Sequence, residues 1–512
     1  MVQCSMIEEG ANFLLLCAIF AMSIYLLWQH FNPPGLPPGP SGVPGLGVLP
    51  SLGPTPYKAL MELSKTYGDV MSLRLGPTLV VVLTGRRAMT EALVKKADFF
   101  SDRPPMPLLN LVHKGRGLMV AKYGPKVHGF RTLLLGTFRR LGVSTPRLDG
   151  LLRPELEALV DAVHRQAGQP TDPKALLNVS ASNMICILAF GKRFDYDDTQ
   201  FQNFLGKLNN IFEISSSPLG FLMLHIPAIV NLPISAIRDT MSDCKFMLDF
   251  LREIVDERWL ALEARRRRDP NIADWEDPSD LLDGYLRTIV CEDVATEMSL
   301  SNEDIAHHFL DLFTAGTESV SHFLQWELLY LTTHPEVQAK AHEELDRVVG
   351  RDRLPSVSDR PNLPYMRAII DEVHRVSSFS PLGIPRMTAD IVDIDGYIIP
   401  KDTMVLSSVW DLHKDPDKWE NPDTFDPSRF LFSNGQVNES KLRQIQAFGL
   451  GFRSCVGRQF AESSIFLYTA SLLQRFFFKS PEGVAPPSLV EDPGVFLTPK
   501  PFKVCVIRRD SK

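Results

Sequence analysis

FGLGFRSCVG, residues 448–457, is the most informative stretch of this 512-residue chain. Its cysteine, Cys455, lies just before a predicted helix, where the helix dipole and backbone N–H groups favour a thiolate. Gly451 and Gly457 allow the backbone to turn and to approach a flat cofactor closely. The stretch therefore predicts a thiolate ligand carried on a tight loop.

Two side chains near Cys455 fit the same hypothesis. Arg453 can pair with a carboxylate of the cofactor, such as a propionate. Phe448 can shield the sulfur from water and tune its electronic properties. The alternative is a glycine-rich loop around a buried structural cysteine. All five fixed positions of F-x-x-G-x-R-x-C-x-G are matched, which favours the ligand hypothesis.

This motif resembles that of the cytochrome P-450 family, in which a cysteine thiolate ligates haem iron. The resemblance is closest to the animal microsomal type and covers nearly all of the chain. It implies a mostly α fold with small β sheets, preceded by one N-terminal transmembrane helix. Haem b is expected between two long helices, with Cys455 as the iron ligand. The function implied is insertion of one oxygen atom from O2 into a lipophilic steroid, fatty acid or terpenoid, by hydroxylation or epoxidation.

A charged trio supports the resemblance independently. Glu372 and Arg375 share one helical face at i and i+3, and alone they would be an ordinary surface ion pair. Together with Arg429 they match the trio that the family uses as a buried network behind the haem loop. The role implied for the trio is structural, not catalytic.

The segment AGTES, residues 315–319, resembles the family's oxygen-activating helix motif, A/G-G-x-D/E-T. Gly316 permits a local distortion of the helix. An acid beside an alcohol, Glu318 and Ser319, can pass protons to bound oxygen. The family usually has Thr at the position of Ser319 and a hydroxyl residue at that of Val320. Since Ser lacks the β-branch, we expect looser proton delivery. The alternative is a polar helix face in a core.

The resemblance also implies that Arg131 and Arg386 contact haem propionates. The family usually has Trp four residues before Arg131, where this chain has Val127. Haem retention is therefore expected to be weaker unless another donor replaces the Trp. His128 is either that donor or, the favoured interpretation, an ordinary exposed histidine.

The N-terminus predicts a membrane anchor over residues 1–30. Ala11–Trp28 is apolar and about 27 Å long as a helix, close to the thickness of a hydrocarbon core. A cleaved signal peptide would need a basic start and a small-residue cleavage site, which are absent here. Residues 31–50, rich in Pro and Gly, predict a rigid hinge, and residues 51–512 predict the haem-binding monooxygenase domain. The location implied is the endoplasmic reticulum membrane, with the catalytic domain in the cytosol.

Composition argues against several classes of function. The net charge of −7 gives no global basic field for nucleic acid. Seven scattered cysteines without a C-x-x-C pair support neither a disulfide framework nor a zinc site. No G-x-G piece completes a dinucleotide fingerprint, so we expect the chain not to bind NADPH itself.

The resemblance implies electrons from NADPH–cytochrome P-450 reductase, with cytochrome b5 as a further partner. Basic residues suited to such docking, or else plain solvated charges, are Lys122, Lys126, Arg139, Arg140 and Arg458. Two other functions stay open: a reductase-independent haem-thiolate isomerase or dehydratase, and a non-catalytic lipid-binding relic.

Hydrophobic periodicity predicts the regular elements. Helices are expected at 57–67, over most of 151–268, and at 299–349, 362–376 and 458–476. Strands are expected at 70–84 (a pair), 391–394, 397–399, 405–408 and 502–507. The apolar segment 219–233 is predicted to belong to the core, with a surface element that dips into the membrane as the alternative. The resemblance predicts an apolar pocket lined by 106–113, 205–212, 309–318, 380–384 and 495–498.

Overall fold

The computed structural model describes residues 34–166, 168–225, 227–268, 277–291, 300–494 and 496–509. The anchor expected over residues 1–30 lies outside these ranges. Among the helices that the structure describes, none is both long and apolar enough to span a bilayer.

Helices make up most of the described chain, as predicted. The α-helices are α2 (Leu49–Leu52), α3 (Pro56–Tyr67), α4 (Arg86–Thr90), α5 (Pro107–His113), α6 (Pro125–Arg140), α7 (Pro146–Arg165), α8 (Lys174–Phe190), α9 (Thr199–Ser216), α10 (Pro218–His225), α11 (Ser235–Arg268), α12 (Leu281–Cys291), α14 (Asn302–Thr333), α15 (Pro335–Val348), α16 (Pro364–Ser377), α17 (Val409–Lys414), α18 (Glu439–Leu442) and α19 (Arg458–Arg475). Short 3₁₀ or π turns are η1 (Glu91–Lys95), η2 (Pro227–Asn231), η4 (Val357–Asn362), η5 (Pro427–Phe430) and η6 (Gly451–Arg453).

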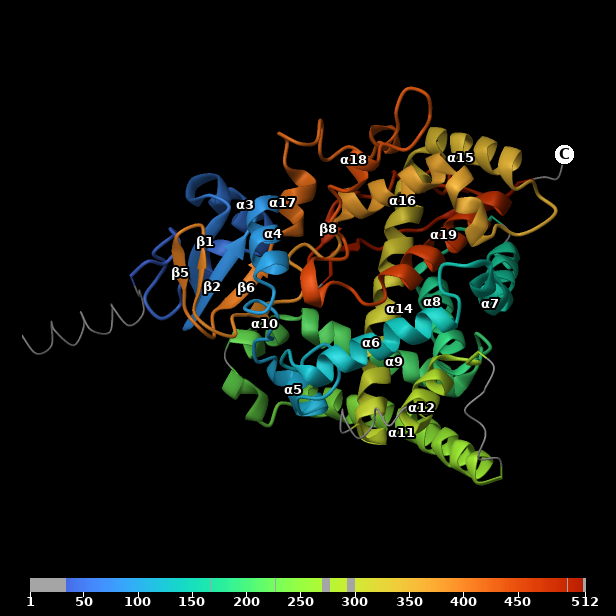
Figure 1. Ribbon diagram of the computed structural model, residues 1–512. Helices are drawn as coiled ribbons and strands as arrows, with labels where there is room; N and C mark the ends of the chain where they lie inside the picture. The colour runs from blue at the N-terminus through green and yellow to red at the C-terminus, as the bar shows by residue number, and fades with distance from the viewer. Residues whose placement is uncertain are drawn as a thin grey trace, which may run out of the picture.

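The principal sheet has four strands in the order β1-β2-β6-β3 and lies to one side of the helices (Figure 1). The strands are β1 (Val70–Leu75), β2 (Thr78–Leu83), β3 (Arg386–Met387) and β6 (Met404–Ser407). The first two form the predicted hairpin, with Val70 opposite Leu83. The second pairing, β2 with β6, is parallel and places Val80 beside Met404, although the two residues are far apart in the sequence.

Three two-stranded sheets complete the β structure. They pair β4 (Val392–Ile394) with β5 (Tyr397–Ile399), β7 (Phe476–Lys479) with β10 (Cys505–Arg508), and β8 (Glu491–Asp492) with β9 (Thr498–Pro499). Strands were therefore predicted correctly at 391–399, and 502–507 overlaps β10.

The long helix α14 passes through the middle of the molecule (Figure 1) and packs against α8, α11, α16 and α19. It begins at a capping box in which Ser301 and Asp304 satisfy each other's backbone N–H groups. Most of its residues are buried on every side, including Phe309, Phe313 and Phe323. Such a helix is a fixed wall against which a site can be built.

The Pro/Gly-rich segment lies directly on β1 where the structure describes it. Ser72 donates its backbone N–H to the Pro38 carbonyl at 2.9 Å and its hydroxyl to the Pro37 carbonyl at 2.6 Å. A Cβ on Gly39 would come within 1.6 Å of the Ser72 carbonyl oxygen, so only glycine fits there. Residues 37–39 are therefore held against the sheet.

The prediction that 219–233 belongs to the core is largely wrong. Met223 is buried, in a small cluster with Leu108 and Ile237. Leu222 and Leu232, however, are 45% and 52% exposed. The segment folds as α10 and η2 on the surface, because it has only this satellite cluster to pack on rather than the main core.

Candidate functional site

The cysteine loop is shaped by hydrogen bonds and by one close backbone approach. The Cys455 N–H donates to the Phe448 carbonyl at 2.8 Å, and α19 begins three residues after the cysteine. Gly451 has φ +69°, and a Cβ there would lie 1.6 Å from the Leu93 carbonyl oxygen. The loop therefore needs glycine at this position because the backbone of η1 packs against it. The sequence instead predicted a close approach of the cofactor at this glycine.

Cys455 is an exposed residue, although enough protein surrounds its sulfur to affect the thiol. Burial raises the pKa of its thiol. A hydrogen bond from the Gly457 N–H and the charges of Arg131 and Arg458 act in the opposite direction and lower it. These groups are the N–H donor and the positive potential that a thiolate ligand requires.

One stripe of α14 is accessible although the helix is otherwise enclosed. Ala315 is exposed, and Leu312 and Ser319, three and four residues away on the same face, are half-buried. The Ser319 hydroxyl donates to the Ala315 carbonyl at 2.6 Å. A Cβ on Gly316 would lie 2.4 Å from the Ile185 side chain, so this glycine lets α8 pack closely. The helix thus combines tight packing on one side with an open stripe on another.

Glu318 does not share the surroundings of Ser319. Its carboxylate is buried and faces α8, where the Asn178 side-chain amide donates to Oε1 at 3.3 Å. Its other oxygen lies 3.2 Å from His322 Nε2. Burial raises the pKa of Glu318, while the Asn178 hydrogen bond and the charge of Lys174 lower it. Glu318 and Ser319 are therefore adjacent in sequence but have different partners: Glu318 bonds to α8, and Ser319 bonds within α14.

Four arginines gather beside the cysteine loop, and none of them forms an ion pair with a described residue. Three of them, Arg131, Arg386 and Arg453, were predicted from the sequence. Arg453 donates to the carbonyls of Ser101, Leu118 and Ala121.

The other two predicted arginines also bind the loop itself. Arg131 donates to the Ser454 carbonyl at 2.8 Å and to its hydroxyl at 3.0 Å. Arg386 donates to the Leu450 carbonyl through one nitrogen, while its Nη1 is buried without a partner. Burial and the charges of Arg453 and Arg131 lower the pKa of Arg386 to about 10.

Arg103 is the fourth member, and sequence reasoning missed it. It is 7% exposed and donates to the carbonyls of Met119, Ile384 and Pro385. Burial and the neighbouring Arg453 and Arg386 lower its pKa strongly. Nothing in the local sequence marks it as buried, because its partners come from distant segments.

This cluster fits a cofactor that carries carboxylates. Buried positive charges without counter-ions are costly, and an unpartnered guanidinium N–H adds to that cost. The two propionates of a haem would supply the missing anions, as Arg–carboxylate pairs do elsewhere. The residues present therefore fit haem bound through Cys455. Val127, at the usual Trp position, is buried, and His128 is exposed, as favoured from the sequence.

The predicted charged trio forms one network. Arg375 pairs with Glu372 at 2.7 Å, and both side chains are fully buried. Arg429 Nε lies 2.9 Å from the same carboxylate. The guanidinium of Arg375 also donates to the carbonyls of His413 and Pro422. The network thus ties α16 to the segment that precedes the cysteine loop.

Aromatic rings from two of the segments expected at the pocket, 205–212 and 495–498, meet at Phe496, together with two rings from outside those segments. Its ring centroid lies 6.1 Å from that of Phe212, at the end of α9, and 5.9 Å from that of Phe379, just after α16. The His322 ring of α14 is 6.0 Å away. An apolar wall is therefore built from α9, α14 and the C-terminal segment.

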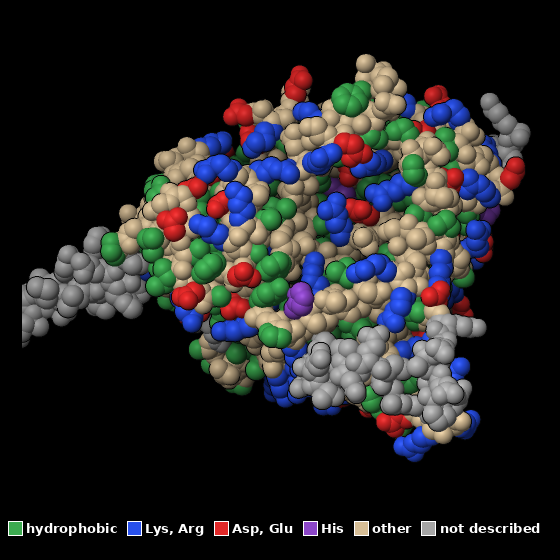
Figure 2. Space-filling view, in the orientation of Figure 1, with side chains coloured by type: hydrophobic (Ala, Val, Ile, Leu, Met, Phe, Trp, Pro, Cys, Tyr) green, Lys and Arg blue, Asp and Glu red, His purple; other side chains and the backbone are tan. Residues whose placement is uncertain are grey.

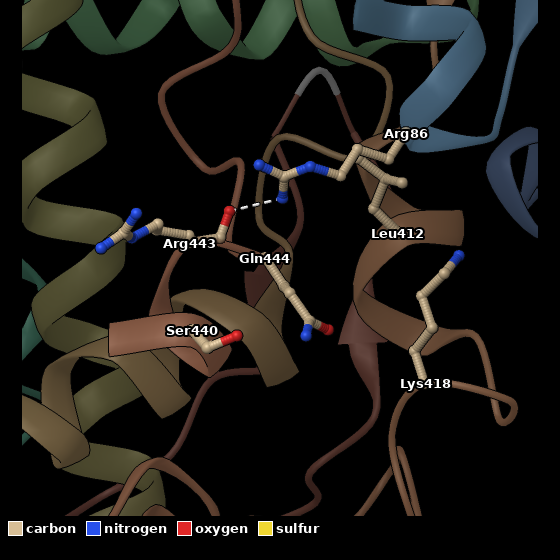
Figure 3. Close-up of a pocket in the computed structure, with 6 residues that line it drawn as sticks. All are labelled: Arg86, Leu412, Lys418, Ser440, Arg443 and Gln444. Atoms are coloured by element: carbon tan, nitrogen blue, oxygen red, sulfur yellow. Dashed lines mark hydrogen bonds between the residues drawn. The ribbon is translucent and has the colours of Figure 1, made fainter. Parts of the chain in front are cut away.

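A surface pocket of about 570 Å³ lies elsewhere, lined by Arg86, Leu412, Lys418, Ser440, Arg443 and Gln444. Figure 3 shows the Arg443 side chain pointing away from that of Arg86, whose guanidinium instead donates to the Arg443 carbonyl. Most of the residues that line this pocket are polar or charged, and it includes neither Cys455 nor the α14 stripe, so it is separate from the site.

Comparison with known proteins agrees with this geometry. The family model for cytochrome P450 matches residues 37–506. The chain is 34% identical to cytochrome P450 2U1 of Mus musculus, covering 97% of this chain and 95% of the relative. It is 34% identical to cytochrome P450 2J3 of Rattus norvegicus (97% and 96%) and 35% to cytochrome P450 1A1 of Canis lupus familiaris (93% and 91%). The chain therefore belongs to the cytochrome P450 family of haem-thiolate monooxygenases.

Proposed function

We propose that the protein carries haem b on Cys455 and inserts one oxygen atom from O2 into a lipophilic substrate. Electrons come from NADPH through NADPH–cytochrome P450 reductase, with cytochrome b5 as a further partner. When bound, a haem iron with a thiolate ligand activates dioxygen. The protein supplies the ligand, the propionate partners, the substrate wall and the protons.

One observation carries the proposal: an accessible Cys455 thiol beside four arginines, two buried and two half-buried, that form no ion pair with a carboxylate among the described residues. A structural cysteine would need neither the positive potential nor the unpaired Arg386 Nη1. In this proposal Arg131, Arg386 and Arg453 bind the propionates. Phe448, whose ring packs against His374, shields the loop.

Proton supply is assigned to Glu318 and Ser319. Ser319 lies on the accessible stripe of α14, where a hydroxyl can hold a proton or a water molecule close to the substrate wall. Glu318 is the adjacent acid, and burial raises the pKa of its carboxyl group, which favours the protonated form that a proton donor needs.

The substrate is proposed to be a steroid, a fatty acid or a terpenoid. The wall of Phe212, Phe379 and Phe496 supports an apolar ligand, since it offers large hydrophobic area and few charges. The test adds a steroid, a fatty acid or a terpenoid to the haem-loaded protein. Only a compound of the class that binds the pocket should shift the haem absorption. Phe496→Ala should weaken that shift.

The protein is proposed to act at the endoplasmic reticulum membrane, with its catalytic domain in the cytosol. Residues 1–30 are the anchor, 31–50 the hinge and 51–512 the monooxygenase domain. The exposed Leu222 and Leu232 support contact with lipid. Figure 2 shows Lys and Arg side chains gathered near the middle of one face of the molecule, a surface suited to an acidic redox partner.

The decisive experiment is the absorption spectrum of reduced, carbon-monoxide-bound membranes, followed by NADPH consumption with added reductase. A strongly red-shifted Soret band is expected in the wild type and in a Cys244→Ala control. Cys455→Ala should lose the band. A band that persists in Cys455→Ala contradicts the ligand assignment. Product formed without NADPH consumption would indicate isomerase or dehydratase chemistry instead.

A further inference from the structure

His322 faces the carboxyl group of Glu318 inside the protein. The two residues lie one turn apart on α14, with His322 Nε2 3.2 Å from Glu318 Oε2. Their side chains are 9% and 6% exposed. At this distance and burial, the histidine N–H is the natural partner of the carboxylate, because a buried charge without a hydrogen bond is strongly disfavoured.

The second oxygen of Glu318 leads toward the surface. Asn178 Nδ2 lies 3.3 Å from Glu318 Oε1 and 2.9 Å from the side-chain oxygen of Asn209 on α9. Asn178 is buried, whereas Asn209 is half-buried. A line of polar side chains therefore connects the carboxyl group with the outer face of α8 and α9.

Two buried polar atoms along this line have no protein partner: Asn178 Oδ1 and His322 Nδ1. Buried polar groups are rarely left unsatisfied, and ordered water commonly fills the need. The two atoms thus mark positions where water can bind beside Glu318 and carry protons. The apolar ring of Phe496 covers the other side of His322.

The electrostatic surroundings favour uncharged forms of both groups. Burial raises the pKa of Glu318 and lowers the pKa of His322 to about 4. Lys174 on α8 is the charged group whose field acts on both, and it lowers both pKa values. Two further neighbours among the described residues are neutral: Asn178 from α8 and Phe496 from the C-terminal segment.

We propose that His322 is a positioning residue that holds the Glu318 carboxyl group between proton transfers, and that Asn178 and Asn209 connect this pair with solvent. The inference rests on the proposed function, in which Glu318 supplies protons. When Glu318 gives up a proton, the neutral His322 donates its Nε2–H to the carboxylate. A solvent water molecule bound beside the Asn178 amide then returns one proton to Glu318, and the pair is restored.

The test follows the protonation of Glu318 directly, in the haem-loaded full chain. Infrared absorption of protonated carboxyl groups is recorded against pH, with Glu318→Gln identifying the Glu318 band. His322→Phe should raise the titration midpoint of Glu318 by about one pH unit, because the carboxylate loses a hydrogen-bond donor. His322→Gln, which keeps an N–H donor, should restore much of the wild-type midpoint. His342→Gln, which alters a histidine that contacts the Phe476 carbonyl, is the matched control.

A functional readout accompanies the titration. His322→Phe should release severalfold more peroxide per NADPH than the wild type and show a larger solvent isotope effect on product formation. In His322→Gln both effects should be smaller than in His322→Phe. An unchanged Glu318 midpoint in His322→Phe overturns the proposal. A shifted midpoint with unchanged peroxide release overturns the relay and leaves only a structural contact. Absence of NADPH consumption in the haem-loaded wild type would instead refute the proposed function, while the carboxyl titration would still report on His322.

Discussion

A buried carboxyl group without a cation beside it, Glu327 of α14, sets a pH dependence of stability. It is 1% exposed, and both of its oxygens lie 2.8 Å from the Thr469 hydroxyl oxygen. That hydroxyl also lies 2.8 Å from the Ile465 carbonyl, to which it can donate its single proton. The geometry then suits a protonated Glu327 that donates to Thr469, and burial raises its pKa from 4.5 to about 8.

The sign of the effect follows from proton linkage. Between pH 4.5 and about 8 the folded protein keeps a proton on Glu327 that the unfolded chain has lost, so the free energy of unfolding falls as pH rises. Glu327→Gln keeps the hydrogen bond without titrating. Urea unfolding at pH 5.5 and pH 7.5 should show a smaller difference in the variant than in the wild type. Equal pH dependence in both proteins would contradict this assignment.

One substitution in the arginine cluster should stabilise the haem-free protein and weaken haem binding in the haem-loaded protein. Arg386→Leu removes a like charge from a buried group of cations, so the haem-free protein should become more stable to heat. The haem-loaded protein should lose its haem faster, because one propionate partner is gone. Haem transfer to an acceptor apoprotein measures the second effect. Arg443→Leu, an exposed arginine, is the control and should change neither.

At the scale of elements, Asp311 of α14 binds the segment 114–121, which follows α5, through hydrogen bonds. Its carboxylate accepts the backbone N–H groups of Leu118 (2.5 Å) and Met119 (3.1 Å) and lies 3.5 Å from His113 Nε2. A Cβ on Gly117, at φ +79°, would lie 2.3 Å from the same carboxylate. The segment can therefore adopt this path only with glycine at 117 and an acceptor at 311.

Asp311→Ala should lower the free energy of unfolding by about 1–3 kcal/mol, because two buried N–H groups lose their acceptor. Limited proteolysis should cut the 114–121 segment faster than in the wild type. Asp249→Ala, at a surface ion pair of α11, is the control. If Asp311→Ala and Gly117→Ala destabilise additively, the two residues do not share one contact, contrary to the structure.

Local sequence patterns predicted the helices and strands better than they predicted which elements pack together. Alternating apolar residues marked the β1–β2 hairpin, and helical spacing marked α3, α14 and α19, because these signals depend only on nearby residues. The pairing of β2 with β6 joins residues about 320 positions apart, and periodicity carries no information on it. The surface position of 219–233 was missed for a related reason, since an apolar run does not reveal how much core is available to cover it.

At the site, too, the sequence predicted individual residues better than it predicted their contacts. The motif predicted Cys455, but the reason for Gly451 is the Leu93 carbonyl, which no sequence pattern indicates. Arg103 stayed hidden because an isolated arginine is usually exposed. Glu318 and Ser319 were predicted as a pair, yet the helix directs one toward α8 and the other along the accessible stripe.

At the scale of the whole molecule, residues 37–47 are fixed against the principal sheet. Gly39 touches the Ser72 carbonyl, and Gly47 comes within 2.0 Å of the Arg74 carbonyl if given a Cβ. Gly39→Ala should displace residues 37–39 and cost about 1–3 kcal/mol of stability through overcrowding. Hydrogen exchange at the Ser72 amide should accelerate. Gly45→Ala is a control with open space around its Cβ, although its φ of +77° adds some strain. Unchanged exchange in Gly39→Ala would contradict the docking.

The three carbonyls held by Arg453 have a consequence for the order of assembly. Through one guanidinium, the cysteine loop is joined to Ser101, Leu118 and Ala121, and Asp311 holds the same segment from the other side. Charge-assisted hydrogen bonds of this kind break together only when the segment opens. If a prosthetic group binds behind this segment, we expect it to exchange at the rate of local unfolding rather than of simple dissociation. Loading during synthesis, before the segment closes, would then be faster than loading of a chain that has folded empty.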